Sequence, residues 1–225
     1  MIIAIDGPSG AGKSTLGKML AENLNLLYLD TGAMYRAVGL SVLENGAKVE
    51  NKEKIIEIAG SAKVELVGEP ENLQVLLNGK DVSKEIRTTQ VGQMASIVST
   101  VSEVRKILVE HQRTLGENAR KGCVLDGRDI GTVVFPNADV KFFLTAKPEA
   151  RARRRFREDS EKGRATTYGQ TLAEINSRDE RDVSREDSPL SIAEDAVVID
   201  TSELDLREVY EQMLAIVREK QNEIS

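Results

Sequence analysis

Short apolar runs along this chain alternate with longer stretches in which apolar residues recur every three or four positions. Five of the short runs are apolar on both faces, which is typical of buried strands in a parallel sheet. The longer stretches have the spacing of amphipathic helices that cover such a sheet. The pattern therefore predicts an α/β fold with a parallel sheet flanked by helices, and its strands are expected at residues 2–5, 26–29, 123–125, 140–144 and 196–199.

Between residues 63 and 82 the apolar positions instead recur every second residue. The turn-forming segment 69–72 and the dipeptide Asn78-Gly79 divide this region into three parts, and Asn-Gly favours a two-residue hairpin turn. We expect a small antiparallel three-stranded meander inserted into the α/β scheme. Composition alone leaves open whether this insert takes part in chemistry or is a peripheral addition. A long helix is predicted to follow at residues 102–120.

Acidic residues and turn signals follow three of the predicted parallel strands, at Asp6-Gly7, Asp30-Thr31-Gly32 and Asp126-Gly127. Ligands of open α/β sheets bind at the carboxyl ends of the strands. These three junctions are therefore expected to line one crevice.

The first of these junctions has the sequence Gly-Pro-Ser-Gly-Ala-Gly-Lys-Ser at residues 7–14, between a predicted strand and a predicted helix. Taken alone it could be a glycine-rich turn with a surface lysine, but the strand before it and the helix after it favour a loop whose backbone N–H groups bind a triphosphate. Lys13 can reach the β- and γ-phosphates, and the Ser14 hydroxyl can bind the accompanying Mg²⁺. The predicted nucleotide-binding residues are Gly7, Pro8, Ser9, Gly10, Ala11, Gly12, Lys13, Ser14 and Thr15.

Arginines gather in the last third of the chain, at residues 151–157 and in a predicted helix at 171–185. On that helix Arg178, Asp182 and Arg185 share one face, because steps of four and three residues return to the same side. The stripe alone fits a solvated helix with intrahelical ion pairs. Beside a phosphate site, the two arginine-bearing helices also fit a closing lid, since guanidinium groups stay charged and hold phosphate oxygens in bidentate geometry.

Composition limits the remaining functions. The chain has 225 residues and a net charge of −6, and no long block of like charge suggests polynucleotide binding. Cys123 is the only cysteine and lies in an apolar run, which is consistent with a reducing cytoplasm. No apolar run has the length of a membrane span, and the first apolar segment has no basic leader, so we expect a soluble, cytoplasmic protein. His111, the only histidine, has no nearby partner for metal binding.

The sequence resembles the bacterial cytidylate kinases in their long form, and the resemblance covers essentially the whole chain. It rests on five blocks, of which several are more specific than a phosphate-binding loop. The meander also resembles the insert in the monophosphate-binding lobe of this family. The blocks are residues 7–14, 29–36 (Leu-Asp-Thr-Gly-Ala-Met-Tyr-Arg), 85–88 (Glu-Ile-Arg-Thr), 126–136 (Asp-Gly-Arg-Asp-Ile-Gly-Thr-Val-Val-Phe-Pro) and 178–182 (Arg-Asp-Glu-Arg-Asp).

The resemblance implies a role for each matching residue. Cytosine would be bound by Ser96, Arg105 and Asp129, and the sugar by Arg178 and Asp182. It further implies that the acceptor phosphate is bound by Arg36, Arg128 and Arg185, that Asp30 and Thr31 also belong to the acceptor site, and that the catalytic residues are Lys13, Arg128, Arg178 and Arg185. Some members of the family carry glycine at the position of Ser14, so magnesium binding by this hydroxyl is an expectation for this chain.

The implied reaction is transfer of the γ-phosphoryl group of ATP, with Mg²⁺, to CMP or dCMP by a monomer that binds no polynucleotide and no membrane. The fold implied is a P-loop NTPase-type sheet with the meander and a helical arginine-rich lid. Its single kinase domain is expected to have a core at about 1–30, 120–147 and 188–225. The monophosphate-binding lobe is expected at about 31–119, with its insert at 61–87, and the lid at about 148–187.

Two alternatives to this function stay open at the level of sequence. A related small kinase could act on another monophosphate or on a small alcohol. A nucleotide-controlled switch or polynucleotide-binding module could instead use the arginine-rich helix as a contact surface. Guanine-specific switches usually carry Asn-Lys-x-Asp, and the similar segment here is Asn-Lys-Glu-Lys at residues 51–54.

Overall fold

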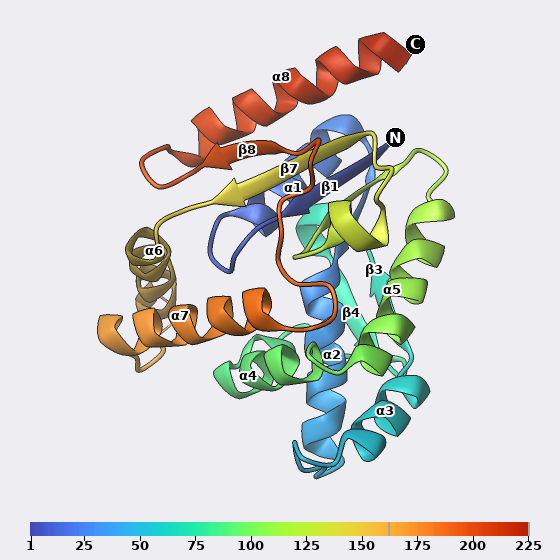
Figure 1. Cartoon of the computed structure of the whole chain (residues 1–225), viewed down its shortest axis with the longest axis vertical. Coiled ribbons are helices and arrows are strands. Elements are labelled where there is room, and N and C mark those ends of the chain that lie inside the picture. The colour runs from blue at the N-terminus through green and yellow to red at the C-terminus, as the bar shows by residue number, and fades with distance from the viewer. Residues whose placement is uncertain (162, 225) are drawn as a thin grey trace.

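A computed structural model describes residues 1–161 and 163–224. Lys162 within the predicted lid and Ser225 at the end of the predicted core lie outside the described residues. A five-stranded sheet with the order β2-β6-β1-β7-β8 forms the centre of the molecule (Figure 1), and every neighbouring pair is parallel. The predicted parallel sheet is confirmed, with strands β1 (Ile2–Asp6), β2 (Leu27–Asp30), β6 (Cys123–Asp126), β7 (Val140–Thr145) and β8 (Val197–Asp200).

Strand β8 differs from the expectation of a strand buried on both faces. It lies at the edge of the sheet, and the side chains of Val197 and Val198 are 38% and 50% exposed. Ile199 is its buried residue and packs into the core beneath α8. The apolar run identified the strand correctly but could not distinguish an edge position from a central one, because both use β-branched residues.

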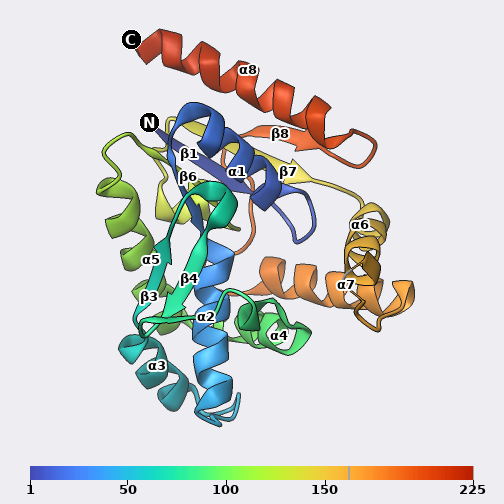
Figure 2. The same ribbon diagram turned by 180° about the vertical axis from the view of Figure 1, so that it is seen from behind.

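Helices cover both faces of the sheet. On one face α1 (Lys13–Leu24) and α8 (Leu206–Ile224) pack against side chains of β1 and β7 (Figure 2). On the other face α5 (Ser102–Glu117) and the short π-helical turn η3 (Ile130–Val134) pack against residues of β2 and β6. Helix α5 ends three residues before the predicted boundary at 120. None of the described helices has both the length and the apolar character that crossing a membrane requires.

Residues 31–108 build a second apolar core beside the sheet. Its helices are α2 (Thr31–Glu44), α3 (Lys52–Ser61), α4 (Thr89–Val98) and the first part of α5, and the short turn η2 (Glu85–Arg87) joins it. The antiparallel meander is confirmed as β3 (Val64–Val67), β4 (Gln74–Leu77) and β5 (Lys80–Asp81), with the 3₁₀ turn η1 (Pro70–Asn72) between the first two. Asn78 and Gly79 have φ angles of 51° and 82°, which fit the predicted Asn-Gly hairpin turn.

Two helices stand beyond the carboxyl end of β7 and away from the sheet (Figures 1 and 2). They are α6 (Pro148–Glu161), which carries the arginine-rich stretch, and α7 (Tyr168–Ser184). Helix α7 begins three residues earlier than predicted because Thr167 and Gln170 form a capping box, in which each side chain bonds to the other residue's backbone N–H.

Candidate functional site

The predicted phosphate-binding loop connects β1 to α1, and its glycines have conformations that other residues adopt with difficulty. The φ angles of Gly7, Gly10 and Gly12 are 141°, 81° and 93°. A Cβ atom on Gly7 would lie 1.9 Å from the carbonyl oxygen of Leu144, so β7 leaves room only for glycine. The loop therefore brings its backbone and the N-terminus of α1 to one cavity, an arrangement that favours anions.

That cavity, of about 620 Å³, lies at the carboxyl ends of the parallel strands. Residues from all three predicted regions reach it, namely the phosphate-binding loop, the two other strand junctions and both arginine-bearing helices. The site residues from the sequence analysis that line it are Ser9, Gly10, Ala11, Gly12, Lys13, Ser14, Thr15, Asp30, Arg36, Arg128 and Arg178.

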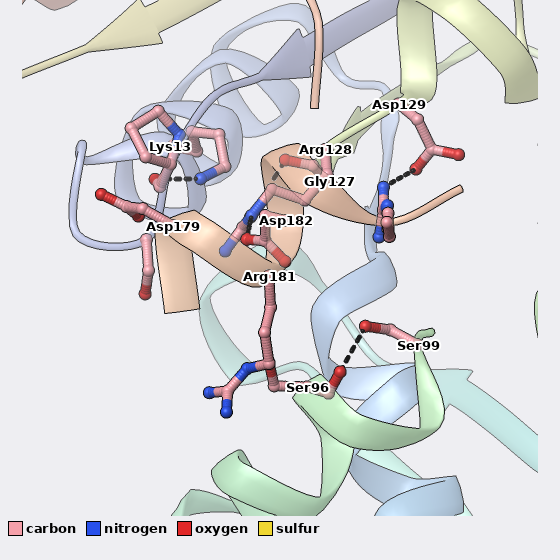
Figure 3. A network of polar contacts seen from close by, with 12 residues as sticks. Lys13, Ser96, Ser99, Gly127, Arg128, Asp129, Asp179, Arg181 and Asp182 are labelled. Carbon is pink, nitrogen blue, oxygen red and sulfur yellow. Dashed lines mark hydrogen bonds and ion pairs between the residues drawn. The ribbon is translucent and has the colours of Figure 1, made fainter. Parts of the chain in front are cut away.

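Lys13 is buried at the floor of the loop, where its Nζ atom donates a hydrogen bond to the Pro8 carbonyl at 2.7 Å (Figure 3). Burial, and next the positive charge of Arg128, lower the pKa of the Lys13 ammonium well below its usual value. A polyphosphate in the cavity would reverse this effect, because its negative charge favours the protonated amine.

Asp126 at the end of β6 is the centre of a buried group of oxygen atoms. Its carboxylate accepts hydrogen bonds from the Ser14 hydroxyl at 2.7 Å and from the Tyr28 hydroxyl at 2.8 Å. Burial and the nearby Asp30 raise the pKa of Asp126 to about 6. A hydroxyl and a carboxylate beside a phosphate-binding loop fit Mg²⁺, which usually takes one or two protein oxygens together with nucleotide phosphates and water.

Of the arginines that line the cavity, the three predicted as site residues come from separate elements. Arg36 lies on α2, Arg128 follows β6, and Arg178 lies on α7. Burial and Arg87 lower the pKa of Arg36 to about 10, while burial and Arg128 lower that of Arg178 to about 9. The buried Nε atom of Arg178 has no hydrogen-bond partner among the described residues. These guanidinium groups are held close to one another and can bind several anionic oxygens at once.

Behind this cluster, the other predicted acceptor residues form ion pairs and hydrogen bonds with one another or with neighbouring arginines (Figure 3). Asp129 forms an ion pair with Arg105 and lies 3.6 Å from a terminal nitrogen of Arg185. Asp182 accepts a hydrogen bond from Arg128 Nε at 2.7 Å. Ser96 on α4 accepts one from Arg181 Nε on α7 at 3.0 Å. The structure therefore brings Ser96, Arg105, Asp129, Asp182 and Arg185 together beside the cavity, but none of them lines it.

Two further predicted residues support the walls of the cavity. Asp30 caps helix α2 by accepting a hydrogen bond from the Ala33 N–H at 2.8 Å, and it lies 3.6 Å from Arg87. Thr31 donates its hydroxyl hydrogen to the Asp126 carbonyl at 2.7 Å. Both residues thus fix the start of α2 against the end of β6. Pro8 and Gly7 also belong to the loop without lining the cavity.

Several further residues line the cavity without a role predicted from the sequence. Arg87 lies in one of the five matching blocks, and Arg154 and Arg155 lie in the arginine-rich stretch. These patterns included the three residues but assigned none of them an individual role. Thr201 follows β8, and the rule that ligands bind at carboxyl ends of strands would have found it. The cavity is also lined by Arg164, Leu204, Asp205, Leu206 and Val209.

Comparison with solved structures gives the fold. The protein resembles an uncharacterized protein from Eubacterium ventriosum, with a TM-score of 0.51 and 14% identity over 97% of this chain and 98% of the other. It also resembles shikimate kinase from Bacteroides thetaiotaomicron, with a TM-score of 0.50 and 14% identity over 99% and 98% of the two chains.

Comparison of sequences is more specific. The cytidylate kinase from Caldanaerobacter subterraneus subsp. tengcongensis is 50% identical over 96% of this chain and 94% of its own length. The cytidylate kinase from Carboxydothermus hydrogenoformans is 48% identical over 98% of each chain. A model of the family described as cytidylate kinase matches residues 3–219. With the phosphate-binding loop and the arginine cluster at one cavity, these similarities show that the chain belongs to the cytidylate kinase family.

Proposed function

We propose that the protein transfers the γ-phosphoryl group of ATP to CMP or dCMP, giving ADP and CDP or dCDP. The observation that carries this proposal is one cavity lined both by the phosphate-binding loop and by a group of arginines that includes Arg36, Arg128 and Arg178. Such a cavity can hold two anionic ligands end to end. Membership of the cytidylate kinase family supports the choice of nucleotides.

The chemistry fits a site without a general base. A nucleoside monophosphate has a second pKa of ~6, so the attacking oxygen is mostly ionised at neutral pH. The enzyme must align two anions that repel each other and neutralise the charge that moves between them. Lys13 and the arginines that line the cavity supply positive charge. Helices α6 and α7 would exclude water by closing over the ligands.

Mg²⁺ would be held by Ser14 and Asp126, whose oxygens lie together beside the loop. When bound, the ion shields the negative charge of the donor phosphates. Asp126 then has a second role, because its carboxylate also holds Tyr28 and, by charge, the Lys13 ammonium. The chain's own residues thus fix the donor side before any acceptor binds.

On the acceptor side, the buried network offers matching groups for cytosine. The Asp129 carboxylate can accept from the exocyclic amine, while Arg105 and Ser96 can donate to ring acceptors. In this proposal Arg178 and Asp182 bind the sugar, and Arg36, Arg128 and Arg185 bind the phosphate, with Asp30 and Thr31 supporting this side. In the structure these groups pair with other side chains, so contacts with the acceptor must replace some of those pairs when it binds.

The proposal includes the division of the chain into a core, a monophosphate-binding lobe and a lid at the boundaries given above. The separate apolar core within residues 31–108 supports the lobe. We further propose that the protein acts as a monomer in the cytoplasm on free nucleotides. Its net charge of −6 would repel polynucleotides outside the cationic cavity.

An acceptor panel tests this function. ADP release would be measured with CMP, dCMP, UMP, AMP, GMP and TMP, with shikimate as a small alcohol. We expect CMP or dCMP to give the highest kcat/KM, and preference for any other acceptor would contradict the assignment.

Lys13→Ala should lower kcat by about 10³-fold or more while the protein stays folded, because charge neutralisation is lost. Near-normal turnover in the folded variant would contradict the role of the loop.

A further inference from the structure

The turn η3 follows directly on the acceptor residues Arg128 and Asp129. It is a π-type turn, in which the Val134 N–H donates to the Asp129 carbonyl at 3.1 Å and the Phe135 N–H donates to the Ile130 carbonyl at 2.7 Å. A helix this short leaves backbone groups at both ends without partners inside it. Those groups need partners from elsewhere in the protein, since Ile130, Gly131 and Val134 of the turn are buried.

Asp6 satisfies the start of the turn. Its two carboxylate oxygens accept hydrogen bonds from the N–H groups of Ile130 at 2.8 Å and Gly131 at 2.7 Å. The side chain of Asp6 is buried at the end of β1, immediately before the phosphate-binding loop. A carboxylate suits this place because both of its oxygens accept, whereas an amide presents one oxygen and one NH₂ group.

Arg113 on α5 satisfies the end of the turn. Its Nε atom donates to the Val134 carbonyl at 3.0 Å, and a terminal nitrogen donates to the Val133 carbonyl at 2.8 Å. The other terminal nitrogen contacts Glu110 at 3.1 Å. The Arg113 side chain is 37% exposed, so it reaches the turn from the surface of the molecule without touching the cavity.

We propose that Asp6 and Arg113 are positioning residues that hold η3 from both ends and thereby place Arg128 and Asp129 relative to the phosphate-binding loop. This rests on the proposed function, in which those two residues bind the acceptor. The Asp129 carbonyl accepts from both Val133 and Val134, so the turn is built on the backbone of an acceptor residue. Loss of either support should therefore weaken acceptor binding more than ATP binding.

The Arg113 series tests the proposal at a surface-accessible residue. Arg113→Gln should raise the KM for CMP about tenfold, since two hydrogen bonds from a charged group are lost, while the KM for ATP changes less than about twofold. Arg113→Lys keeps a cation that can reach a carbonyl and should restore much of the CMP affinity. Glu110→Gln is the matched control, because it removes the negative charge beside Arg113 and leaves the turn supported.

Asp6→Asn tests the other end of η3. The amide places an NH₂ group against one backbone N–H, so the KM for CMP should again rise more than the KM for ATP. If this variant does not fold, the Arg113 series decides the question alone. A purely structural role would lower the active fraction, and hence kcat, without separating the two KM values. Equal changes in both KM values, or a change in kcat only, would overturn the proposal.

The wild-type acceptor panel separates this proposal from the proposed function. If the panel shows another preferred acceptor, the assignment to CMP fails, and the Arg113 and Asp6 variants are measured with that acceptor instead. If these variants bind that acceptor more weakly while their ATP binding is unchanged, the proposal that Asp6 and Arg113 hold η3 is still supported. If CMP is preferred but the variants bind it as tightly as wild type, the proposed function stands and the positioning role of Asp6 and Arg113 is refuted.

Discussion

Asp126 is buried beside the phosphate-binding loop, where its carboxylate accepts hydrogen bonds from Ser14 and Tyr28. Burial and Asp30 raise its pKa from the usual 3.8 to about 6. A carboxyl group with a higher pKa in the folded state holds its proton more tightly there than in the unfolded chain. The resulting stability is complete at low pH and is lost as the pH rises from about 4 to about 6. At neutral pH the ionised Asp126 carboxylate therefore lowers the stability of the folded protein.

Asp126→Asn should remove this pH dependence. When the pH rises from 4.5 to 7.5, the difference in free energy of unfolding between variant and wild type should shift in favour of the variant by on the order of 2 kcal/mol. The reason is that the amide does not ionise. Urea unfolding at the two pH values measures this change. We expect the same variant to lose most activity, since a magnesium ligand is lost. Parallel changes with pH in both proteins would show that Asp126 titrates normally.

Sequence position predicted which of these side chains lie near one another, but not how they pair. The cations and carboxylates of the acceptor side were placed by the strand-end rule, by helical spacing and by resemblance to a family. The pairing of Asp129 with Arg105 depends on how α5 lies against the segment after β6, and that of Ser96 with Arg181 on how α4 lies against α7. No local pattern contains either relation. The same holds for Asp6, whose partners lie 124 and 125 residues away in the chain.

At the scale of elements, one arginine connects helices α6 and α7 to the phosphate-binding loop. Arg151 on α6 is buried, and its guanidinium group donates to the carbonyls of Ala146 and Ser9 at 2.8 and 3.2 Å. It also forms a bidentate pair with Asp179 on α7, at 3.0 and 2.6 Å. The orientation of both helices relative to the phosphate-binding loop thus depends on one planar group with several fixed donors.

Arg151→Lys should therefore disturb the donor side. A lysine ammonium cannot make all of these contacts, so we expect the free energy of unfolding to fall by about 2–4 kcal/mol and the KM for ATP to rise severalfold. Chemical denaturation and initial-rate kinetics measure the two effects. Arg153→Lys, an exposed arginine on the same helix, is the control and should behave as wild type. Equal ATP affinity in the two variants would contradict the role of Arg151.

Sequence patterns predicted most elements because each was encoded locally. The Asn-Gly turn fixed the hairpin, and the apolar runs fixed the strands. The early start of α7 was also encoded, in the spacing of Thr167 and Gln170, although the helix was assigned from its arginine stripe. The turn η3 could not be predicted in this way, since Asp6 and Arg113 satisfy its ends from distant parts of the chain.

At the scale of the whole molecule, a cavity rich in arginines lies in a protein whose net charge is negative. The chain carries a net charge of −6, yet its main cavity gathers the guanidinium groups of Arg36, Arg128 and Arg178. Burial and mutual repulsion lower the pKa values of Arg36 and Arg178, which shows that holding these charges together opposes folding. An anion in the cavity removes much of this cost by neutralising several arginines at once.

A polyphosphate without a nucleoside should therefore stabilise the protein. With Mg²⁺ absent, 1 mM tripolyphosphate is expected to raise the midpoint of thermal unfolding by roughly 4–8 °C if binding contributes ~2 kcal/mol. Arg178→Gln removes one of the repelling charges, so the free variant should be at least as stable as wild type and should gain less than about half of that shift. Arg120→Gln removes an exposed arginine outside the cavity and should show the full shift. If both variants respond equally, the anion binds by the general charge of the protein, and the arginine cluster is not what recognises phosphate.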